Sequence, residues 1–198
     1  MKFVLASKNE GKLREIKSML SKYNLEVCLE SDIGVDIEVE ETGDTFEDNS
    51  MLKASAVMKA TGLPSIADDS GLCIDALGGQ PGVYSARFGG ETTDYNTKCN
   101  TILSMMADAK DRSAHFECVI SCYFPNGDII VAHGECHGKI AHKPAGYNGF
   151  AYDMIFIPDG YDKTFAELEA EEKNKISHRG KAIKDFEDKL REYRKLGR

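Results

Sequence analysis

Two adjacent carboxylates, Asp68 and Asp69, stand at the centre of the segment 67–71, which reads ADDSG. Apolar residues lie on both sides, so the pattern is typical of a buried strand, a sharp turn and a second strand. Adjacent strand residues point to opposite faces, so the two carboxylates cannot both simply face solvent. A carboxylate at the end of an apolar strand is costly unless it binds a cation or a proton. The segment therefore predicts a Mg²⁺ site that activates water, and a plain Asp/Ser turn is the alternative.

A second acidic group lies in the segment 35–41, which reads VDIEVEE. Apolar and acidic residues alternate there, which predicts an exposed strand that ends at Thr42-Gly43. A solvated acidic edge explains such a run. Alternatively, a carboxylate at the end of the run completes a metal site with Asp69, because Mg²⁺ needs only one or two protein carboxylates beside substrate phosphates.

The loop 7–12, which reads SKNEGK, follows the continuously apolar strand 3–6 and precedes a helix with apolar residues at helical spacing. The free N–H groups at a helix N-terminus favour an anion, and Lys8 and Lys12 add positive charge. The loop is not a Walker A motif, because Ala6 replaces its first glycine and Leu13 replaces its Ser or Thr. The loop therefore indicates either an anion site or a plain connection.

A further lysine lies on the helix that we expect to begin after Thr45, with Asp48 completing an approximate capping box. The expected apolar stripe of this helix is Met51, Ala54 and Met58. Asn49 and Lys53 then lie on the opposite face, where they either meet water or, in the case of Lys53, bind phosphate.

The last segments that could do chemistry are the aromatic run 147–153 and the basic run 171–180. Aromatic side chains at a loop tip either stack on a base or pack in the core. Ser177 can cap the final helix, which places His178 and Arg179 in its first turn. Because the N-terminal end of a helix repels cations, an arginine there indicates an anionic partner, with a solvated arginine as the alternative.

The remaining pattern predicts the elements that position these residues. It indicates a strand at 25–29, a helix at 94–107, and strands at 115–124 and 129–135 that are joined by an Asn-Gly hairpin. Glycines and a proline in the segment 78–82 predict a shaped loop. The length predicts one domain, residues 1–198, or one domain with a small lobe.

Composition limits the function. The net charge of −8 over 198 residues argues against binding to a nucleic-acid polymer. Since no apolar run approaches the roughly 20 residues that span a bilayer, we expect no membrane segment. Six cysteines without a CxxC pair favour reduced thiols in the cytoplasm. Cys118 and Cys122 would lie roughly 13 Å apart on an extended strand, which argues against a zinc site with His133 and Cys136.

Taken together, the chain resembles the inosine/xanthosine triphosphate pyrophosphatase family, whose members remove nonstandard nucleotides. The resemblance runs from residue 5 to about residue 186 in five ordered blocks: LASKNEGK at 5–12, EETGDTFEDNSMLKA at 40–54, IADDSGLCIDALGGQPGVYSARFGG at 66–90, GFAYDMIF at 149–156 and EEKNKISHRG at 171–180. The central block is highly specific.

The resemblance implies a role for each matched residue. Asp69 would be the general base and a Mg²⁺ ligand, and Glu40 would be the second ligand, with Glu41 as the other candidate. Residues that would bind the triphosphate are Ser7, Lys8, Asn9, Glu10, Gly11, Lys12, Lys53 and Ser70. Residues that would enclose the base are Phe150, Ala151, Tyr152, Asp153, Lys173, His178 and Arg179.

The resemblance also implies a fold and a reaction. The fold would be of the α/β class: a long mixed sheet flanked by helices, ITPase-like, with two lobes and a central active-site cleft. The assembly would be a homodimer. The reaction would be hydrolysis of ITP, dITP and XTP to the monophosphate and pyrophosphate. A Maf-type pyrophosphatase acting on modified pyrimidine triphosphates and a non-catalytic nucleotide-binding regulator are the alternatives. The family usually has glycine where this chain has Ala151, so base preference is the least certain inheritance.

Overall fold

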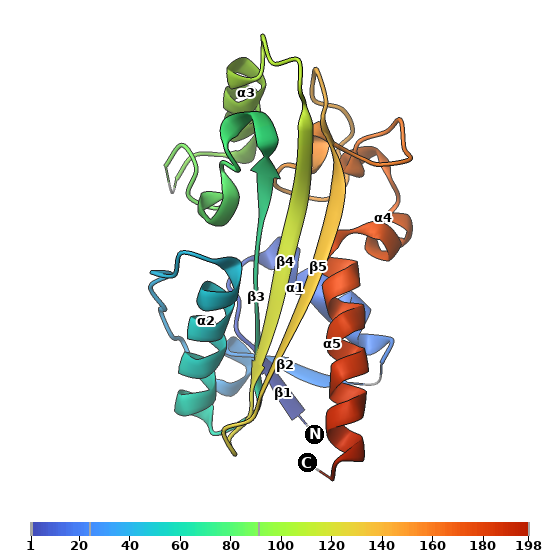
Figure 1. The fold of residues 1–198 in the computed structure, drawn as a ribbon. Coiled ribbons are helices and arrows are strands. Elements are labelled where there is room, and N and C mark those ends of the chain that lie inside the picture. Colours follow the sequence, from blue (N-terminus) through green and yellow to red (C-terminus); the bar gives the residue numbers. More distant parts are fainter. Residues whose placement is uncertain (1, 24, 91, 198) are drawn as a thin grey trace. The chain divides into compact units, whose positions relative to one another are not determined.

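A six-stranded mixed sheet in the order β2-β1-β3-β4-β5-β6 organises the chain in the computed structural model, which describes residues 2–23, 25–90 and 92–197 (Figure 1). The strands are β1 (Lys2–Leu5), β2 (Glu26–Leu29), β3 (Ser65–Ile74), β4 (Ser113–Tyr123), β5 (Ile129–Ile140) and β6 (Phe156–Pro158). Strand β1 pairs parallel with β2 and β3, whereas β5 and β6 are antiparallel. The helices are α1 (Glu10–Ser21), α2 (Phe46–Thr61), α3 (Tyr95–Met105), α4 (Ala170–Ile176) and α5 (His178–Lys195). The fold is therefore α/β, as expected.

The chain divides into two compact units. Unit 1 contains residues 1–69, 118–134 and 179–198, and unit 2 contains residues 70–117 and 135–178. The long strands β3, β4 and β5 each contribute residues to both units.

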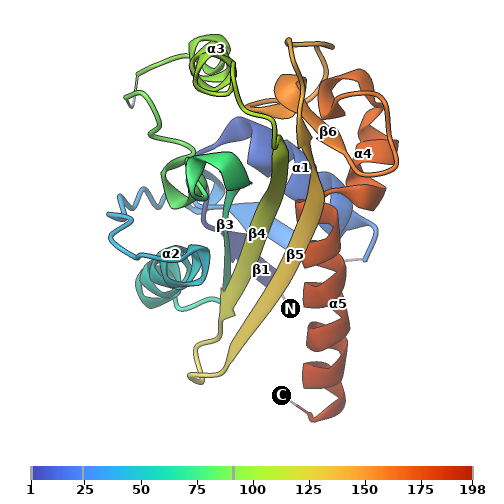
Figure 2. The ribbon, with the colours of Figure 1, turned by 45° about the horizontal axis from the view of Figure 1, so that its top comes forward.

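Unit 1 buries both faces of its strands. Phe3, Leu5 and Ile66 pack with apolar residues of α1 and α5, whereas Val4 and Ala67 pack with apolar residues of α2. Successive residues of β1 and β3 thus enter different cores, because side chains alternate along a strand. Figure 2 shows α2 and α5 on opposite sides of the strands. A residue of β3 in this unit therefore faces either α1 and α5 or α2.

Unit 2 has one apolar core, in which even-numbered residues of the long strands pack with α3 and the aromatic run. Its buried members are Leu72, Ile74, Cys99, Ile102, Met106, Ala114, Phe116, Cys136, Ile140, Tyr152, Ile155, Phe156, Phe165 and Leu168. The hairpin between β4 and β5 turns at Asn126-Gly127, where Gly127 has a φ of +90°. This confirms the hairpin that the sequence predicts, with both strands longer than expected.

Two sequence predictions of local structure are wrong. The segment 67–71 does not turn; it lies inside the continuous strand β3. Its carboxylates are compensated by buried cations, so the chain has no need to leave the sheet. The segment 35–41 is not a strand and has no regular secondary structure. Side chains of α2, and not a neighbouring strand, hold the end of this segment.

Helix α2 begins after Thr45 as predicted, and the Thr45 side chain accepts a hydrogen bond from the Asp48 backbone. Its buried face differs from the expected stripe and consists of Phe46, Asn49, Ser50, Ala54 and Val57. Asn49 is therefore buried, not solvated.

Among the helices of the described residues, none is both long enough and apolar enough to cross a membrane.

Candidate active site

The adjacent carboxylates of β3 point to opposite faces of the sheet in unit 1. Asp68 follows the alternation of Ile66 and faces α1 and α5, whereas Asp69 follows Ala67 and faces α2. Both side chains are buried. Each carboxylate therefore needs its own cationic partners on its own face.

Asp68 is held by two cations from α1 and α5. Its Oδ2 lies 3.2 Å from Lys12 Nζ and 3.2 Å from an Arg179 nitrogen. The other terminal nitrogen of Arg179 lies 2.5 Å from Glu15 Oε2. Burial favours the neutral acid, but the charges of Lys12 and Arg179 outweigh it and lower the pKa of Asp68. Asp68 is thus an ionised anchor for the ends of two helices.

Asp69 faces a lysine and a second carboxylate. Lys53 Nζ lies 3.1 Å from Asp69 Oδ1 and 2.6 Å from Glu41 Oε1, so these two oxygens lie within about 6 Å of each other. Burial raises the pKa of Asp69, and the charge of Lys53 only partly offsets this. A buried carboxylate with a raised pKa beside a charged partner is typical of a functional site.

The arrangement at Asp69 fits a divalent cation. Asp69 Oδ2 is buried and has no hydrogen-bond partner among the described residues. Such an oxygen is costly unless a ligand engages it. The donor set consists of carboxylate oxygens, which are the ligands that Mg²⁺ prefers. Burial alone would lower the pKa of Lys53. The carboxylates around Lys53 outweigh burial and raise this pKa, so the cluster favours a positive charge.

Of the two candidate second ligands, the structure brings Glu41 and not Glu40 to this cluster. Glu41 is half-buried and binds Lys53, whereas the Glu40 side chain is exposed. Asn49, which is 0% exposed, accepts a hydrogen bond from Gly43 N at 2.8 Å and donates one to Gly43 O at 3.3 Å. A Cβ at Gly43 would lie 2.8 Å from the Asn49 amide oxygen, so the position requires glycine. Asn49 therefore fixes the chain that carries Glu41.

The loop 7–12 forms the capped N-terminus of α1. The Asn9 side chain accepts a hydrogen bond from the Lys12 backbone at 3.1 Å, and Ser7 Oγ accepts one from Asn9 N at 3.3 Å. Glu10 is exposed, Gly11 is buried in the first turn, and the Lys8 ammonium lies 2.6 Å from Asp36 on the exposed surface. Of the two loop lysines, only Lys12 is turned toward the carboxylates of β3.

In unit 2, the structure brings together Phe150, Asp153 and Lys173. Asp153 Oδ2 accepts hydrogen bonds from Phe150 N and from Lys173 Nζ, both at 2.7 Å. The Lys173 ammonium also lies 5.1 Å from the centre of the Phe150 ring. Gly149, with a φ of +74°, passes so close to Asp153 that a Cβ there would lie 2.1 Å from the carboxylate. The loop is thus folded tightly around one carboxylate, with the Phe150 ring half-exposed.

Tyr152 of this loop and His178 at the start of α5 are both buried in unit 2. Tyr152 is 1% exposed and donates a hydrogen bond to the Ser85 carbonyl at 2.7 Å, so it packs in the core. His178 is buried and stacks on Phe116. Ala151 has a φ of +56°, a left-handed conformation that glycine adopts more freely. The departure of this chain from the family pattern therefore carries local backbone strain.

Arg179 is placed differently from the sequence prediction. It was expected beside the base, but it is 2% exposed in unit 1 and its guanidinium binds Asp68 and Glu15. Asp68 and Glu15 are therefore the anionic partners that we expect for an arginine at the N-terminus of a helix. Ser70, the next residue of β3 after Asp69, is half-buried and belongs to unit 2.

Three residues of these clusters are not among the site residues predicted from the sequence. Glu15 lies one helical turn after Lys12, a spacing that places both side chains on one face of α1. Asp68 was discussed only as a neighbour of Asp69, although strand alternation demands a separate partner for it. Asn49 was assigned to a solvated face, and only the structure shows that it binds Gly43.

Comparisons with known proteins find similarity over nearly the whole chain. The sequence profile of the Ham1 family matches residues 3–189. The chain is 48% identical to a dITP/XTP pyrophosphatase of Shigella flexneri, over 96% of this chain and 98% of that protein. It is 44% identical to a dITP/XTP pyrophosphatase of Streptomyces avermitilis, with the same coverage. The solved structure of the Staphylococcus aureus Ham1 protein matches with a TM-score of 0.88 and 41% identity, over 98% of this chain and all of that one.

We expect Asp68→Asn to lower the free energy of unfolding by about 3–5 kcal/mol, because Lys12 and Arg179 lose a buried counter-charge. Urea unfolding followed by circular dichroism measures the change. Asp188→Asn removes the exposed partner of Lys184 and should leave stability unchanged. Equal effects of the two substitutions would contradict the anchoring role of Asp68.

We expect Ala151→Gly to raise the free energy of unfolding by about 0.5 kcal/mol, because glycine relieves the positive φ at a smaller entropic cost. Ala145→Gly, in the same loop but without a positive φ, should lower it by about 0.5–1 kcal/mol. Thermal and urea unfolding of the two variants would test this opposite sign. A loss of stability in both would show that Ala151 is not strained.

Proposed function

The chain belongs to the Ham1 family, and from this premise we propose that it is a nucleoside-triphosphate pyrophosphatase that hydrolyses ITP, dITP and XTP. The products would be the nucleoside monophosphate and pyrophosphate. The observation that carries the proposal is a buried oxygen of Asp69, beside Glu41 and Lys53, that has no hydrogen-bond partner within the part of the chain that the structure describes. Relatives at 44–48% identity over nearly the whole chain are named dITP/XTP pyrophosphatases, which supports it.

Asp69 and Glu41 would hold Mg²⁺, with phosphate oxygens completing the coordination. The ion would neutralise the negative charge of the triphosphate during hydrolysis. Lys53 already lies between the two carboxylates, so its ammonium is placed to contact a phosphate that arrives there. We therefore propose Glu41, not Glu40, as the second metal ligand.

Asp69 would also act as the general base. Its raised pKa brings its basicity closer to that needed for proton transfer at neutral pH, and its buried Oδ2 can accept a proton from water. The attacking water would thereby be oriented toward the α-phosphate.

The leaving pyrophosphate would be bound by the loop 7–12 and Lys12. The first turn of α1 offers backbone N–H groups that have no acceptor within the helix, and the helix dipole favours an anion there. Asp68 keeps the Lys12 ammonium close to β3, so a charged group is available without a large rearrangement.

The base would be recognised by residues of unit 2. The half-exposed Phe150 ring offers a stacking surface, and the Asp153–Lys173 pair fixes the loop that carries it. Donors aimed at the 6-oxygen of hypoxanthine or xanthine would meet the 6-amino donor of adenine, which leaves buried polar groups unpaired. With Arg179 engaged by Asp68 and Glu15, backbone N–H groups are the better candidates for these donors.

The resemblance further supports a homodimer in the cytoplasm. All six cysteines are free and buried, which agrees with a reducing compartment. The names of the relatives favour the purine pyrophosphatase over a Maf-type enzyme. The pair of carboxylates at Lys53 argues against a regulator that only binds nucleotide, since binding alone needs no such pair.

A panel of natural and deaminated triphosphates with Mg²⁺ tests the function. We expect ITP, dITP and XTP to be hydrolysed at least about 100-fold more efficiently than ATP, because of the donor mismatch at position 6. Chromatography of the products should show monophosphate and pyrophosphate. Release of single phosphates, a preference for pyrimidine triphosphates, or binding of ITP without turnover would each refute the proposal.

A series of carboxylate variants tests the site. Asp69→Asn should lower kcat by about 100-fold or more while ITP still binds, because the base and one metal ligand are lost. Glu41→Gln should raise the Mg²⁺ concentration for half-maximal rate by about tenfold or more. The adjacent Glu40→Gln is the matched control and should resemble the wild type. The reverse order of Glu40 and Glu41 would return the metal ligand to Glu40.

A further inference from the structure

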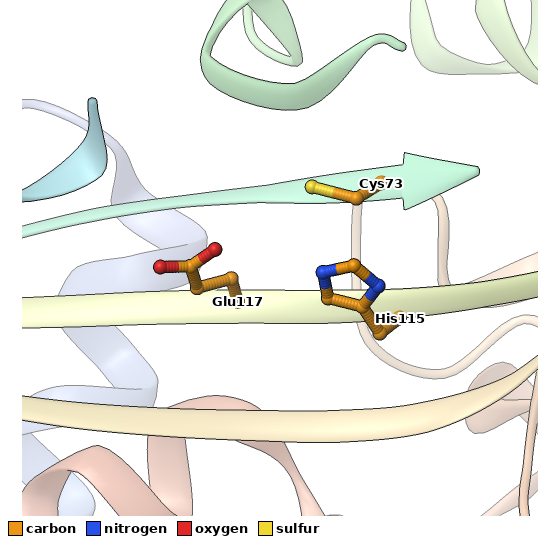
Figure 3. Close-up of side chains that lie close together, drawn as sticks. All are labelled: Cys73, His115 and Glu117. Atoms are coloured by element: carbon orange, nitrogen blue, oxygen red, sulfur yellow. The ribbon is translucent and has the colours of Figure 1, made fainter. Parts of the chain in front are cut away.

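A second cluster of metal-ligand side chains lies in unit 2, on residues that have no role in the proposed hydrolysis. Figure 3 shows Cys73 on β3 close to His115 and Glu117 on the neighbouring strand β4. One ligand atom from each side chain lies within 4.8 Å of the other two. A thiol, an imidazole and a carboxylate thus converge from two strands.

Strand geometry explains why these three side chains meet. His115 and Glu117 are two residues apart and therefore point to the same face of β4. The intervening Phe116 and the neighbouring Ala114 enter the apolar core of unit 2. On β3, Leu72 and Ile74 enter that core, so Cys73 points the other way. The cluster thus lies on the sheet face opposite to the core. The strands hold the three side chains at fixed positions, which favours a well-defined site.

The next strand adds further polar groups to this face. Glu135 and His137 on β5 are exposed, and the rings of His115 and His137 lie 5.4 Å apart between centres. His137 Nε2 lies 3.1 Å from Glu135 Oε2. The carboxylates of Glu117 and Glu135 add negative charge to this face, which favours a cation.

We propose that Cys73, His115 and Glu117 form a binding site for a divalent transition-metal ion of the Zn²⁺ type. Sulfur, nitrogen and oxygen donors together suit such an ion and not Mg²⁺, which prefers oxygen alone. Three protein ligands leave one position for water. On binding, the S–H bond of Cys73 breaks, its proton passes to solvent and a metal–sulfur bond forms. The ion would join β3 to β4.

The distances between the three ligand atoms are compatible with a bound Zn²⁺ ion. Ligand atoms around tetrahedral Zn²⁺ lie about 3.5 Å from one another, so ligand atoms that lie within 4.8 Å need to approach by at most roughly 1.3 Å. His115 and Glu117 are only half-buried, and rotation of their side chains can supply this contraction. Cys73 is 9% exposed and is held by the sheet, so it defines the position of the ion.

Cobalt absorption tests the site, because Co²⁺ bound to a thiolate gives a charge-transfer band that oxygen ligands alone do not give. Co²⁺ is added to the reduced, metal-free full chain in excess Mg²⁺, which occupies the carboxylates at Lys53. We expect one equivalent to produce the band and Zn²⁺ to abolish it by displacement. Cys73→Ser should lose the band, and His115→Ala should weaken binding at least tenfold. His133→Ala removes an imidazole of β5 outside the cluster and should bind like the wild type.

Circular dichroism verifies that each variant is folded. If Cys73→Ser does not fold, the half-buried His115→Ala still decides, because its replacement leaves the core intact. Absence of the band in the wild type, or an unchanged affinity in His115→Ala, would overturn the proposal. Neither result would affect the hydrolytic function, which rests on other residues.

Discussion

The placement of two ionised groups next to each other on one buried strand is the constraint on which unit 1 depends. Strand alternation sends Asp68 toward α1 and α5 and Asp69 toward α2, so each carboxylate takes the ion pairs described above from its own face. The result is two separate ion clusters on the two faces of β3. One cluster connects α1 and α5 to β3 through Lys12 and Arg179. The other connects α2 to β3 through Lys53. Ion pairs therefore join three helices to this strand, in addition to the apolar contacts.

The two clusters differ in their balance of charge, and this difference separates structure from chemistry. Asp68 has a lowered pKa and two cations beside it, which suits an anchor. Asp69 has a raised pKa and one lysine that it shares with Glu41. A structural ion pair gains nothing from carboxylates that outnumber the cation between them. A site that must admit a metal ion favours this arrangement, because the ion supplies the missing positive charge.

Much of the fold and part of the site could be predicted from the sequence. Strong periodicity and caps identified β1, α1, α3, the hairpin and α5, because those signals are local. The turn expected at segment 67–71 failed because its carboxylates are compensated by Lys12, Lys53 and Arg179, which lie far away in the sequence. The strand predicted at 35–41 does not form, because alternation of apolar and acidic residues does not reveal whether a partner strand exists. Asn49 illustrates the same limit, since its hydrogen bonds to Gly43 follow from packing and not from pattern.

Arg179 shows how a local rule can be correct while the anion that it predicts lies within the protein. The N-terminal turn of α5 demands an anion beside this cation, and Asp68 and Glu15 provide it. These two carboxylates engage the two terminal nitrogens of the guanidinium within unit 1. Lys173 is committed in the same way to Asp153 in unit 2. In the function proposed above, backbone N–H groups of the Phe150 loop would select the 6-oxygen, because Asp153 fixes the position of this loop through the Phe150 amide.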